Sequence, residues 1–270
     1  MPTVAVNGIT LAYETHGSGE PLVLISGIGY DRWEWHKMVP GLAGHFTVIV
    51  FDNRGVGQSD KPAGPYTAQL LADDTAGLIA ALGGARAHVM GHSLGGYIAQ
   101  ALALSHPDLI DNLILASTNF GGPRHIPITP EAMAVLTDVK SDPVTRFKNG
   151  LNVSTAPGYA EKNPEMIEAW AAWRVQNPIE PAAYQAQLAI GLALFAENAC
   201  FEGKLKQVGA STLILFGAHD KVVQPGNAEL LAREIPHSTI EILPDAGHFF
   251  PIETPEAANA AIIKFLKGDY

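Results

Sequence analysis

Short apolar runs recur along the chain, each bounded by glycine, proline or small polar residues. Their length and their content of valine, isoleucine and leucine are typical of buried strands. Most are followed by a longer stretch in which apolar residues recur at helical spacing. The strands predicted in this way are Pro21–Ile25, Thr47–Phe51, Ala87–Met90, Asn112–Ala116, Ser211–Phe216 and Thr239–Leu243, and the helices are Arg32–Leu42, Ala68–Leu82, Tyr97–Ser105, Gly226–Glu234 and Pro255–Lys267.

A hairpin precedes the first buried strand. Asn7-Gly8 is a strong hairpin signal, and it separates the strand-like segments Thr3–Val6 and Ile9–Thr15. The second segment alternates apolar and polar residues, which is typical of an antiparallel strand with one exposed face. Because apolar strands alternate with amphipathic helices over most of the chain, we expect an α/β fold with a mostly parallel sheet covered by helices on both faces.

The alternation of strands and helices breaks after about residue 120. Up to residue 203 there is no strand pattern, only helical segments punctuated by proline, such as Pro164–Asn177 and Pro181–Ala199. The apolar residues at helical spacing in these two segments are Met166, Trp170 and Trp173, and Tyr184, Leu188, Leu192 and Phe195. We therefore expect residues 1–120 and 204–270 to form an α/β core and residues 121–203 to form a helical insertion.

The segment Gly91-His92-Ser93-Leu94-Gly95 joins a predicted strand to a predicted helix. A serine at the apex of such a turn has a strained backbone, and glycines two residues to either side leave the space that a Cβ would fill. The helix that follows directs free N–H groups and the positive end of its dipole toward the serine. Ser93 is therefore a candidate nucleophile.

A serine hydroxyl needs a base to take its proton at neutral pH, and a carboxylate to orient that base. His248 follows the last predicted strand and Asp220 follows the strand before it, so both are expected at the same sheet edge as Ser93. Asn119 also follows a strand, but an amide cannot balance the charge of an imidazolium. Asp245 is so close to His248 in sequence that it is better suited to shaping the turn.

Composition limits the class of partner. A formal net charge of −10 and the lack of any run of Lys and Arg argue against nucleic acid. The single cysteine, Cys200, excludes an intramolecular disulfide and fits a reducing compartment, and it is expected to be buried. No secretory signal is visible, and the longest apolar segment, Leu188–Ala196, is too short to span a bilayer. We expect a soluble, cytoplasmic protein with no membrane partner.

The histidines and glycines do not indicate a cofactor. The ten histidines show no metal-ligand spacing, and no lysine followed by serine or threonine comes after Gly95-Gly96 to make a phosphate loop. No metal and no cofactor are therefore expected.

Several motifs together resemble the α/β-hydrolase family, in particular its compact esterases and enol-lactonases with a helical cap. The resemblance covers nearly the whole chain and implies a mostly parallel eight-stranded sheet with the insertion as the cap. The residues that carry it are Asp52-Asn53-Arg54-Gly55-Val56-Gly57-Gln58-Ser59, Gly91-His92-Ser93-Leu94-Gly95-Gly96, Gly217-Ala218-His219-Asp220 and Ala246-Gly247-His248.

The resemblance also implies roles for particular residues. The nucleophile, acid and base named above would form a catalytic triad, and the backbone N–H groups of Leu94 and Ile28 would form an oxyanion hole. The chain departs from many relatives at Ser26-Gly27, where they have His-Gly, so the loop before Ile28 is expected to be held differently.

The reaction expected from this constellation is hydrolysis of a small to medium carboxylic ester through an acyl-enzyme intermediate. Enol-lactone and C–C bond hydrolysis use the same triad, and a hydrolase-fold receptor for a small molecule is the alternative from another class. A serine at the elbow argues against the chemistry of the related dehalogenases and epoxide hydrolases, which use an aspartate there. The aromatic residues predicted to line the substrate pocket are Phe120, Trp170, Phe195 and Phe249.

Other polar residues in these motifs have structural interpretations. His92 and His219 are expected to make local hydrogen bonds rather than to transfer protons. The loop Asp52–Ser59 is expected to be architectural, with Asp52 and Arg54 forming ion pairs rather than touching substrate.

Overall fold

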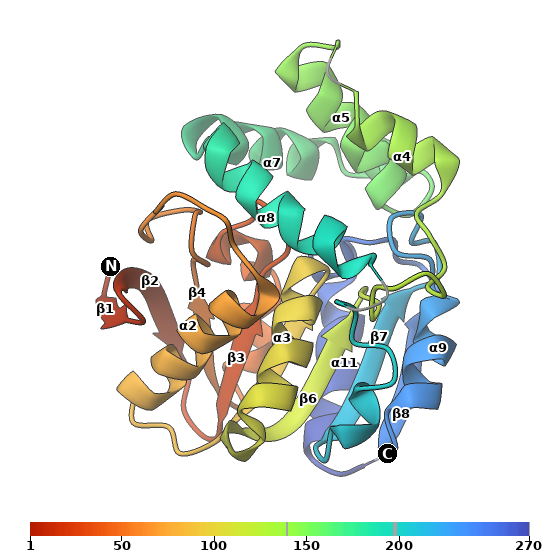
Figure 1. Ribbon diagram of the computed structural model, residues 1–270. Coiled ribbons are helices and arrows are strands. Elements are labelled where there is room, and N and C mark those ends of the chain that lie inside the picture. Colours follow the sequence, from red (N-terminus) through yellow and green to blue (C-terminus); the bar gives the residue numbers. More distant parts are fainter. Residues whose placement is uncertain (139, 197–198, 270) are drawn as a thin grey trace.

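The computed structural model of the chain describes residues 1–138, 140–196 and 199–269. These residues contain an eight-stranded sheet in the order β1-β2-β4-β3-β5-β6-β7-β8 (Figure 1). The strands are β1 Thr3–Val6, β2 Ile9–His16, β3 Pro21–Ile25, β4 Thr47–Phe51, β5 Ala87–His92, β6 Ile110–Ala116, β7 Ser211–Gly217 and β8 Ser238–Leu243.

The sheet is antiparallel at one edge and parallel elsewhere. β1 pairs antiparallel with β2 through a turn in which Asn7 and Gly8 have φ angles of 46° and 76°, and β2 pairs antiparallel with β4. Positive φ at both turn residues is what a tight hairpin turn of this kind requires. From β4 to β8 every pairing is parallel. The predicted hairpin edge and mostly parallel sheet are both confirmed.

Helices cover both faces of the sheet. Along β3, Val23 and Ile25 belong to one apolar cluster, whereas Leu22 and Leu24 belong to another on the opposite face. Both faces of the central strands are therefore buried, which is why these strands are continuously apolar. The first face is covered by α2 (Ala68–Ala81), α3 (Leu94–Ser105) and α9 (Asn227–Glu234), and the second by η1 (Arg32–Trp35), α1 (Val39–Leu42) and α11 (Pro255–Leu266).

The single helix predicted over Arg32–Leu42 is two short helices instead. The side chain of Asp31 accepts the backbone N–H of Trp33 and begins η1, whereas α1 has Pro40 in its first turn. Because proline has no N–H to donate, one continuous helix cannot run through Pro40. Glu34 and Trp35, in η1, are both fully buried.

Between β6 and β7 the chain forms a layer of helices across one end of the sheet (Figure 1). The described residues of this interval contain no strand, as expected. We call α4–α8 the helical layer. Its helices are α4 Pro130–Leu136, α5 Pro143–Ser154, α6 Tyr159–Lys162, α7 Pro164–Gln176 and α8 Pro181–Leu194.

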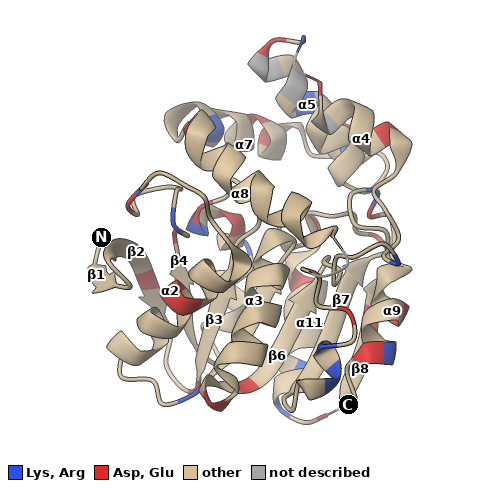
Figure 2. Ribbon diagram, viewed as in Figure 1, with Lys and Arg blue, Asp and Glu red and all other residues tan. Residues whose placement is uncertain are grey.

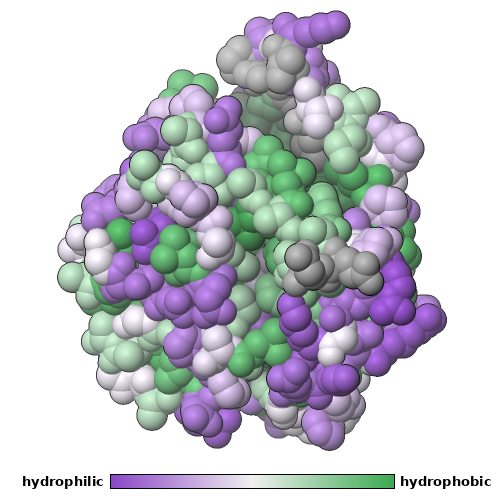
Figure 3. Space-filling view, viewed as in Figure 1, coloured by the Kyte–Doolittle hydropathy of each residue, from purple (hydrophilic) through white to green (hydrophobic). Residues whose placement is uncertain are grey.

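α8 buries a different face from the one that its large apolar residues mark. Leu188, Leu192 and Phe195 are 42%, 59% and 43% exposed, and hydrophobic surface is visible over α8 in Figure 3. Helical spacing identifies a stripe but not the side that meets the core, and here another set of residues, which includes one amide, faces inward. The buried residues of α8 are Ala183, Gln187, Ile190 and Leu194.

α8 also ends earlier than predicted, at Leu194. The carbonyl oxygen of Leu194 accepts the N–H of Gly122 from a neighbouring loop at 2.7 Å. Glu197 and Asn198, near the end of the predicted helix, lie outside the described residues.

The remaining short elements are η2 Pro107–Leu109, η3 Leu205–Gln207 and α10 Phe250–Glu253. Acidic and basic residues are scattered over loops, helices and strands, and neither α3 nor α8 carries a charged residue (Figure 2). Cys200 is buried, as expected. Among the described residues, no helix is long and apolar enough to cross a membrane, and no three metal-ligating side chains are grouped to hold an ion.

Candidate active site

Ser93 occupies a strained turn between β5 and α3. Its φ and ψ angles are 55° and −116°, a combination that a residue with a side chain rarely adopts. A Cβ at Gly91 would lie 2.1 Å from the carbonyl oxygen of Gly95, and a Cβ at Gly95 would lie 2.1 Å from the carbonyl oxygen of Ile25. Neither position can hold a side chain, so the glycines are required for the turn expected around Ser93.

His248 and Asp220 form a buried hydrogen-bonded pair. The Nδ1 of His248 lies 2.8 Å from Oδ2 of Asp220, and these side chains are only 5% and 0% exposed. The other carboxylate oxygen of Asp220 accepts the backbone N–H groups of Val222 and Val223, each at 2.8 Å. These bonds fix the carboxylate, which in turn holds the proton of His248 on Nδ1 and leaves Nε2 as the acceptor.

His92 brings the predicted nucleophile and base together. It immediately precedes Ser93 in the chain, and its ring centre lies 4.8 Å from that of His248. Within the described residues, neither the hydroxyl of Ser93 nor Nε2 of His248 has a hydrogen-bond partner. In ligand-free enzymes the bond between nucleophile and base is often long and tightens when substrate binds.

The two alternative acids occupy other environments. The side-chain oxygen of Asn119 accepts the hydroxyl of Tyr97 and the backbone N–H of Gly121. Asp245 is exposed at the turn after β8. Of the three candidates, Asp220 is the one hydrogen-bonded to His248 in the described structure.

The loop that carries His248 is held partly by the helical layer. The backbone N–H of His248 donates to the carbonyl oxygen of Ser154, at the end of α5, at 2.7 Å. Glu253 accepts the backbone N–H of Gly247 and, at 2.6 Å, that of Ala156. Burial raises the pKa of Glu253 to about 7, against the lowering effect of these hydrogen bonds. The helical layer is therefore part of what positions His248.

The side chain of Ser26 holds the loop before Ile28. The hydroxyl of Ser26 accepts the indole N–H of Trp35 at 2.8 Å and donates to the carbonyl oxygen of Asp31. Within the described residues, the backbone N–H groups of Ile28 and Leu94 have no acceptor. Two free N–H groups, one beside Ser93 and one on the facing loop, are what an oxyanion site needs.

A buried pair, His92 and Glu34, links the loops around Ser93. The Nε2 of His92 donates to the carbonyl oxygen of His248 at 2.8 Å, and its Nδ1 lies 2.7 Å from Oε1 of Glu34. The other carboxylate oxygen of Glu34 accepts the N–H of Gly27 at 2.8 Å. Burial alone lowers the pKa of His92, but the charge of Glu34 and the bond to it outweigh burial and raise that pKa. These are the local hydrogen bonds predicted for His92.

Of the predicted pocket residues, Trp170 and Phe249 lie together beside His248. Their rings meet edge to face at 4.9 Å, and the ring of Phe249 lies 5.5 Å from that of His248. Phe120 is buried in the cluster shared with α3, away from this pair. Phe195 lies on the outside, stacked on His125 at 4.9 Å. The aromatic residues that extend the pair into a larger cluster are Tyr30, Trp33, Phe147 and Trp173.

The loop after β4 is architectural, as predicted, but Asp52 and Arg54 pair with other residues rather than with each other. Asp52 accepts Nη1 of Arg32 at 2.8 Å and the backbone N–H of Gln58 at 2.7 Å. Arg54 donates to both carboxylate oxygens of Asp74, at 2.7 and 2.8 Å. His219 is exposed.

Glu34 and Gln187 are two buried polar residues that sequence reasoning missed. Glu34 lies between Trp33 and Trp35. A carboxylate between two tryptophans was a signal that Glu34 would be buried, and a buried carboxylate needs a partner. Gln187 falls one helical turn after Ala183 on α8, so it shares the face of the helix that turned out to be buried.

Comparison with known proteins gives one family. The family model for the alpha/beta hydrolase fold matches residues 20–255. The chain is 27% identical to 3-oxoadipate enol-lactonase 2 of Acinetobacter baylyi, over 98% of this chain and 96% of that protein.

Solved structures agree with the family match. A thermophilic esterase from Thermogutta terrifontis superposes with a TM-score of 0.82 at 31% identity, covering 99% of this chain and 98% of the other. The enol-lactonase from Burkholderia xenovorans superposes with a TM-score of 0.80 at 28% identity, covering 98% and 100%. Because each superposition covers nearly all of this chain, it includes both the sheet and the helical layer.

The buried pair predicts how stability depends on pH. Because Glu34 raises the pKa of His92, the pair contributes stability that is fully present below about pH 6.5 and is lost as the pH rises through the raised pKa. The variant Glu34→Gln can bond to a neutral His92, whose pKa is then lowered by burial. Urea denaturation at several pH values should show about 1–2 kcal/mol lower stability near pH 6, recovering as the pH rises.

The matched control is Glu256→Gln, at an exposed position of α11. It should keep the pH dependence of the wild type. Identical pH profiles for Glu34→Gln and the wild type would show that Glu34 does not set the protonation of His92.

Proposed function

Because this chain belongs to the α/β-hydrolase family, we propose that it is a serine hydrolase that cleaves small to medium carboxylic esters through an acyl-enzyme intermediate. The observation that carries the proposal is the buried bond between His248 and Asp220 beside the strained turn at Ser93. The esterase and the enol-lactonases among the similar proteins support hydrolysis at an acyl carbon. The single cysteine favours a reducing, cytoplasmic location.

In the proposed reaction, Nε2 of His248 takes the proton of Ser93 as Oγ attacks the ester carbonyl carbon. The backbone N–H groups of Leu94 and Ile28 bind the oxygen that becomes negative, and each such donor is worth about 3 kcal/mol in the transition state. His248 then gives its proton to the leaving alcohol. A water molecule, deprotonated by the same histidine, releases the carboxylic acid and regenerates Ser93. No cofactor enters this scheme.

We further propose that residues 121–203 form a cap over the site. Phe249 and Trp170 are the best candidates for an apolar wall, because the ring of Phe249 packs against that of His248 and the ring of Trp170 packs against Phe249. Phe120 stays a predicted lining residue. Phe195 is left out of the proposed pocket because it is on the outer surface of the cap.

The direct test of the proposal is Ser93→Ala. Removing the nucleophile should lower kcat for p-nitrophenyl acetate and butyrate by about 10⁴-fold or more, with the fold intact by circular dichroism. Esters of increasing acyl length and a lactone, assayed beside them, separate esterase from lactonase activity. Tight ligand binding without turnover in the wild type would favour the receptor alternative, and unchanged turnover in Ser93→Ala would rule out this mechanism.

A second prediction concerns the acid. Asp220→Asn keeps the shape of the side chain but removes the charge that stabilises the imidazolium, so kcat should fall by about 10⁴-fold. Asp245→Asn, the same change at an exposed aspartate near His248, should leave kcat within about twofold of wild type. Steady-state kinetics on both variants checks the assignment, which fails if the larger loss belongs to Asp245.

A further inference from the structure

Ile28 lies in a tight turn whose geometry sets the direction of its N–H. The N–H of Tyr30 donates to the carbonyl oxygen of Gly27 at 3.3 Å, and Gly29, the third residue of the turn, has a φ of +68°. A positive φ at this position is what a type II turn requires. Because the carbonyl of Gly27 and the N–H of Ile28 belong to one peptide group, whatever holds this turn also aims the proposed oxyanion donor.

Two side chains of the cap hold the turn at Gly29. The N–H of Gly29 donates to Oε1 of Gln187 at 2.9 Å, and its carbonyl oxygen accepts Nη1 of Arg174 at 2.8 Å. A Cβ at Gly29 would lie 2.8 Å from Cδ1 of Ile179, so the cap closes directly onto this residue. Both polar groups of the Gly29 backbone thus depend on the cap and not on the α/β core.

Gln187 joins two loops of the core at once. Besides accepting from Gly29, its Nε2 donates to the carbonyl oxygen of Arg54 at 3.0 Å, in the loop after β4. Its side chain is fully buried. An amide supplies an acceptor and a donor together, and the two partners determine which terminal atom is the oxygen and which is the nitrogen. A carboxylate could make only the first bond, and an apolar side chain of similar length could make neither.

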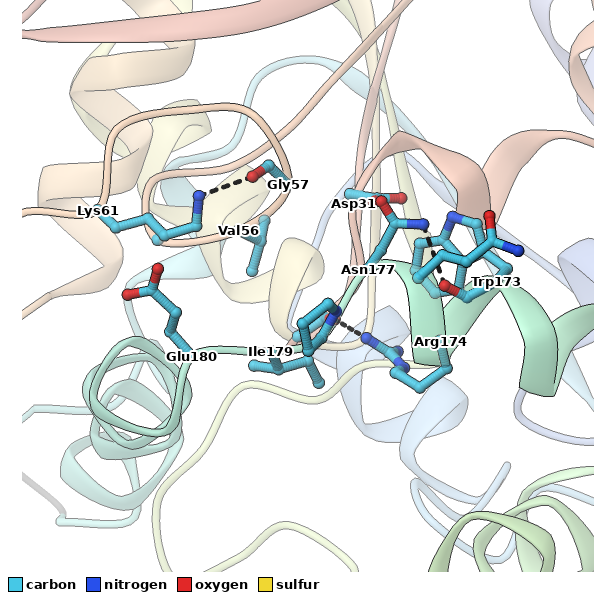
Figure 4. Close-up of a pocket in the computed structure, with 13 residues that line it drawn as sticks. Asp31, Val56, Gly57, Lys61, Trp173, Arg174, Asn177, Ile179 and Glu180 are labelled. Atoms are coloured by element: carbon cyan, nitrogen blue, oxygen red, sulfur yellow. Dashed lines mark hydrogen bonds between the residues drawn. The ribbon is translucent and has the colours of Figure 1, made fainter. Parts of the chain in front are cut away.

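The contact from Arg174 is less enclosed than that from Gln187. Gly29 and Arg174 border a pocket of about 230 Å³ between the connection from α7 to α8 and the loop after β4 (Figure 4). Arg174 also lies over the rings of Tyr30 and Trp173, at 4.6 and 4.7 Å. Substituting Arg174 would disturb these rings as well, so Gln187 is the cleaner probe of the turn.

We propose that Gln187 is a positioning residue that makes the oxyanion hole depend on the closed cap, an inference that rests on the proposed function. When the cap is docked, Gln187 holds the peptide that follows Ile28 and ties it to the loop at Arg54. When the cap lifts away, the turn loses this partner, and the N–H of Ile28 is no longer directed at the proposed oxyanion position. Attack of Ser93 on the ester is then confined to the closed state, in which both oxyanion donors are in place.

The test compares two glutamines of α8. Gln187→Met removes both bonds at nearly constant size, and a donor misplaced by about 1 Å should lower kcat by about 10- to 100-fold with little change in KM. Gln185→Met is the matched control, because Gln185 is exposed on the same helix, and it should behave as wild type. Thermal unfolding of both variants shows whether the cap and core remain folded at the assay temperature.

A pH series on Gln187→Glu separates positioning from general loosening of the cap. A protonated carboxyl group can accept from Gly29 and donate to Arg54, whereas the ionised form cannot donate. The ratio of kcat for Gln187→Glu to kcat for the wild type should therefore rise as the pH falls from about 8 to about 5.5. The same ratio for Gln187→Met should stay constant.

Three results would overturn the inference: unchanged kcat in Gln187→Met, a rise in KM alone, or a pH-independent deficit in Gln187→Glu. Failure of the proposed function has a different signature. It would appear as full activity in Ser93→Ala or as the absence of ester turnover in the wild type.

Discussion

The buried interaction between His92 and Glu34 is the constraint on which the candidate site depends. Through its two ring nitrogens and the two carboxylate oxygens, this pair connects the backbone of the His248 loop, the turn at Ser93 and the loop at Gly27. Parallel strands bring three loops to one sheet edge, but they do not fix the loops relative to one another. A fully buried, charge-assisted chain of hydrogen bonds does so, because a lost partner inside the protein is not replaced by water.

The same loops are held from the other side by the helical layer. The carbonyl oxygen of Ser154 accepts the N–H of His248, and the N–H of Ala156 donates to the carboxylate of Glu253. The side chain of Gln187 accepts the N–H of Gly29. The candidate site is therefore built between two parts of the chain that are far apart in sequence. This arrangement connects the helical layer directly, through hydrogen bonds, to the loops that carry the candidate site residues.

The sequence predicted the sheet, its antiparallel edge and the turn at Ser93, because hydrophobic runs, Asn7-Gly8 and the glycines around Ser93 are local signals. It also placed Asp220 and His248 at the same sheet edge as Ser93, because each follows a predicted strand. It did not predict which face of α8 is buried, nor the partners of Arg54 and Gln187. Those depend on side chains that approach from distant segments, such as Asp74 and Gly29, and no local pattern encodes them.

The central claim is that Ser93 becomes covalently acylated. Rapid mixing with p-nitrophenyl butyrate, acid quenching within the first turnover and mass spectrometry of the digested protein test it most directly. We expect a butyryl group on the peptide that contains Ser93, appearing with the burst of p-nitrophenol and decaying as acid is released. Turnover with no acylated peptide, or with the acyl group on another residue, would contradict it.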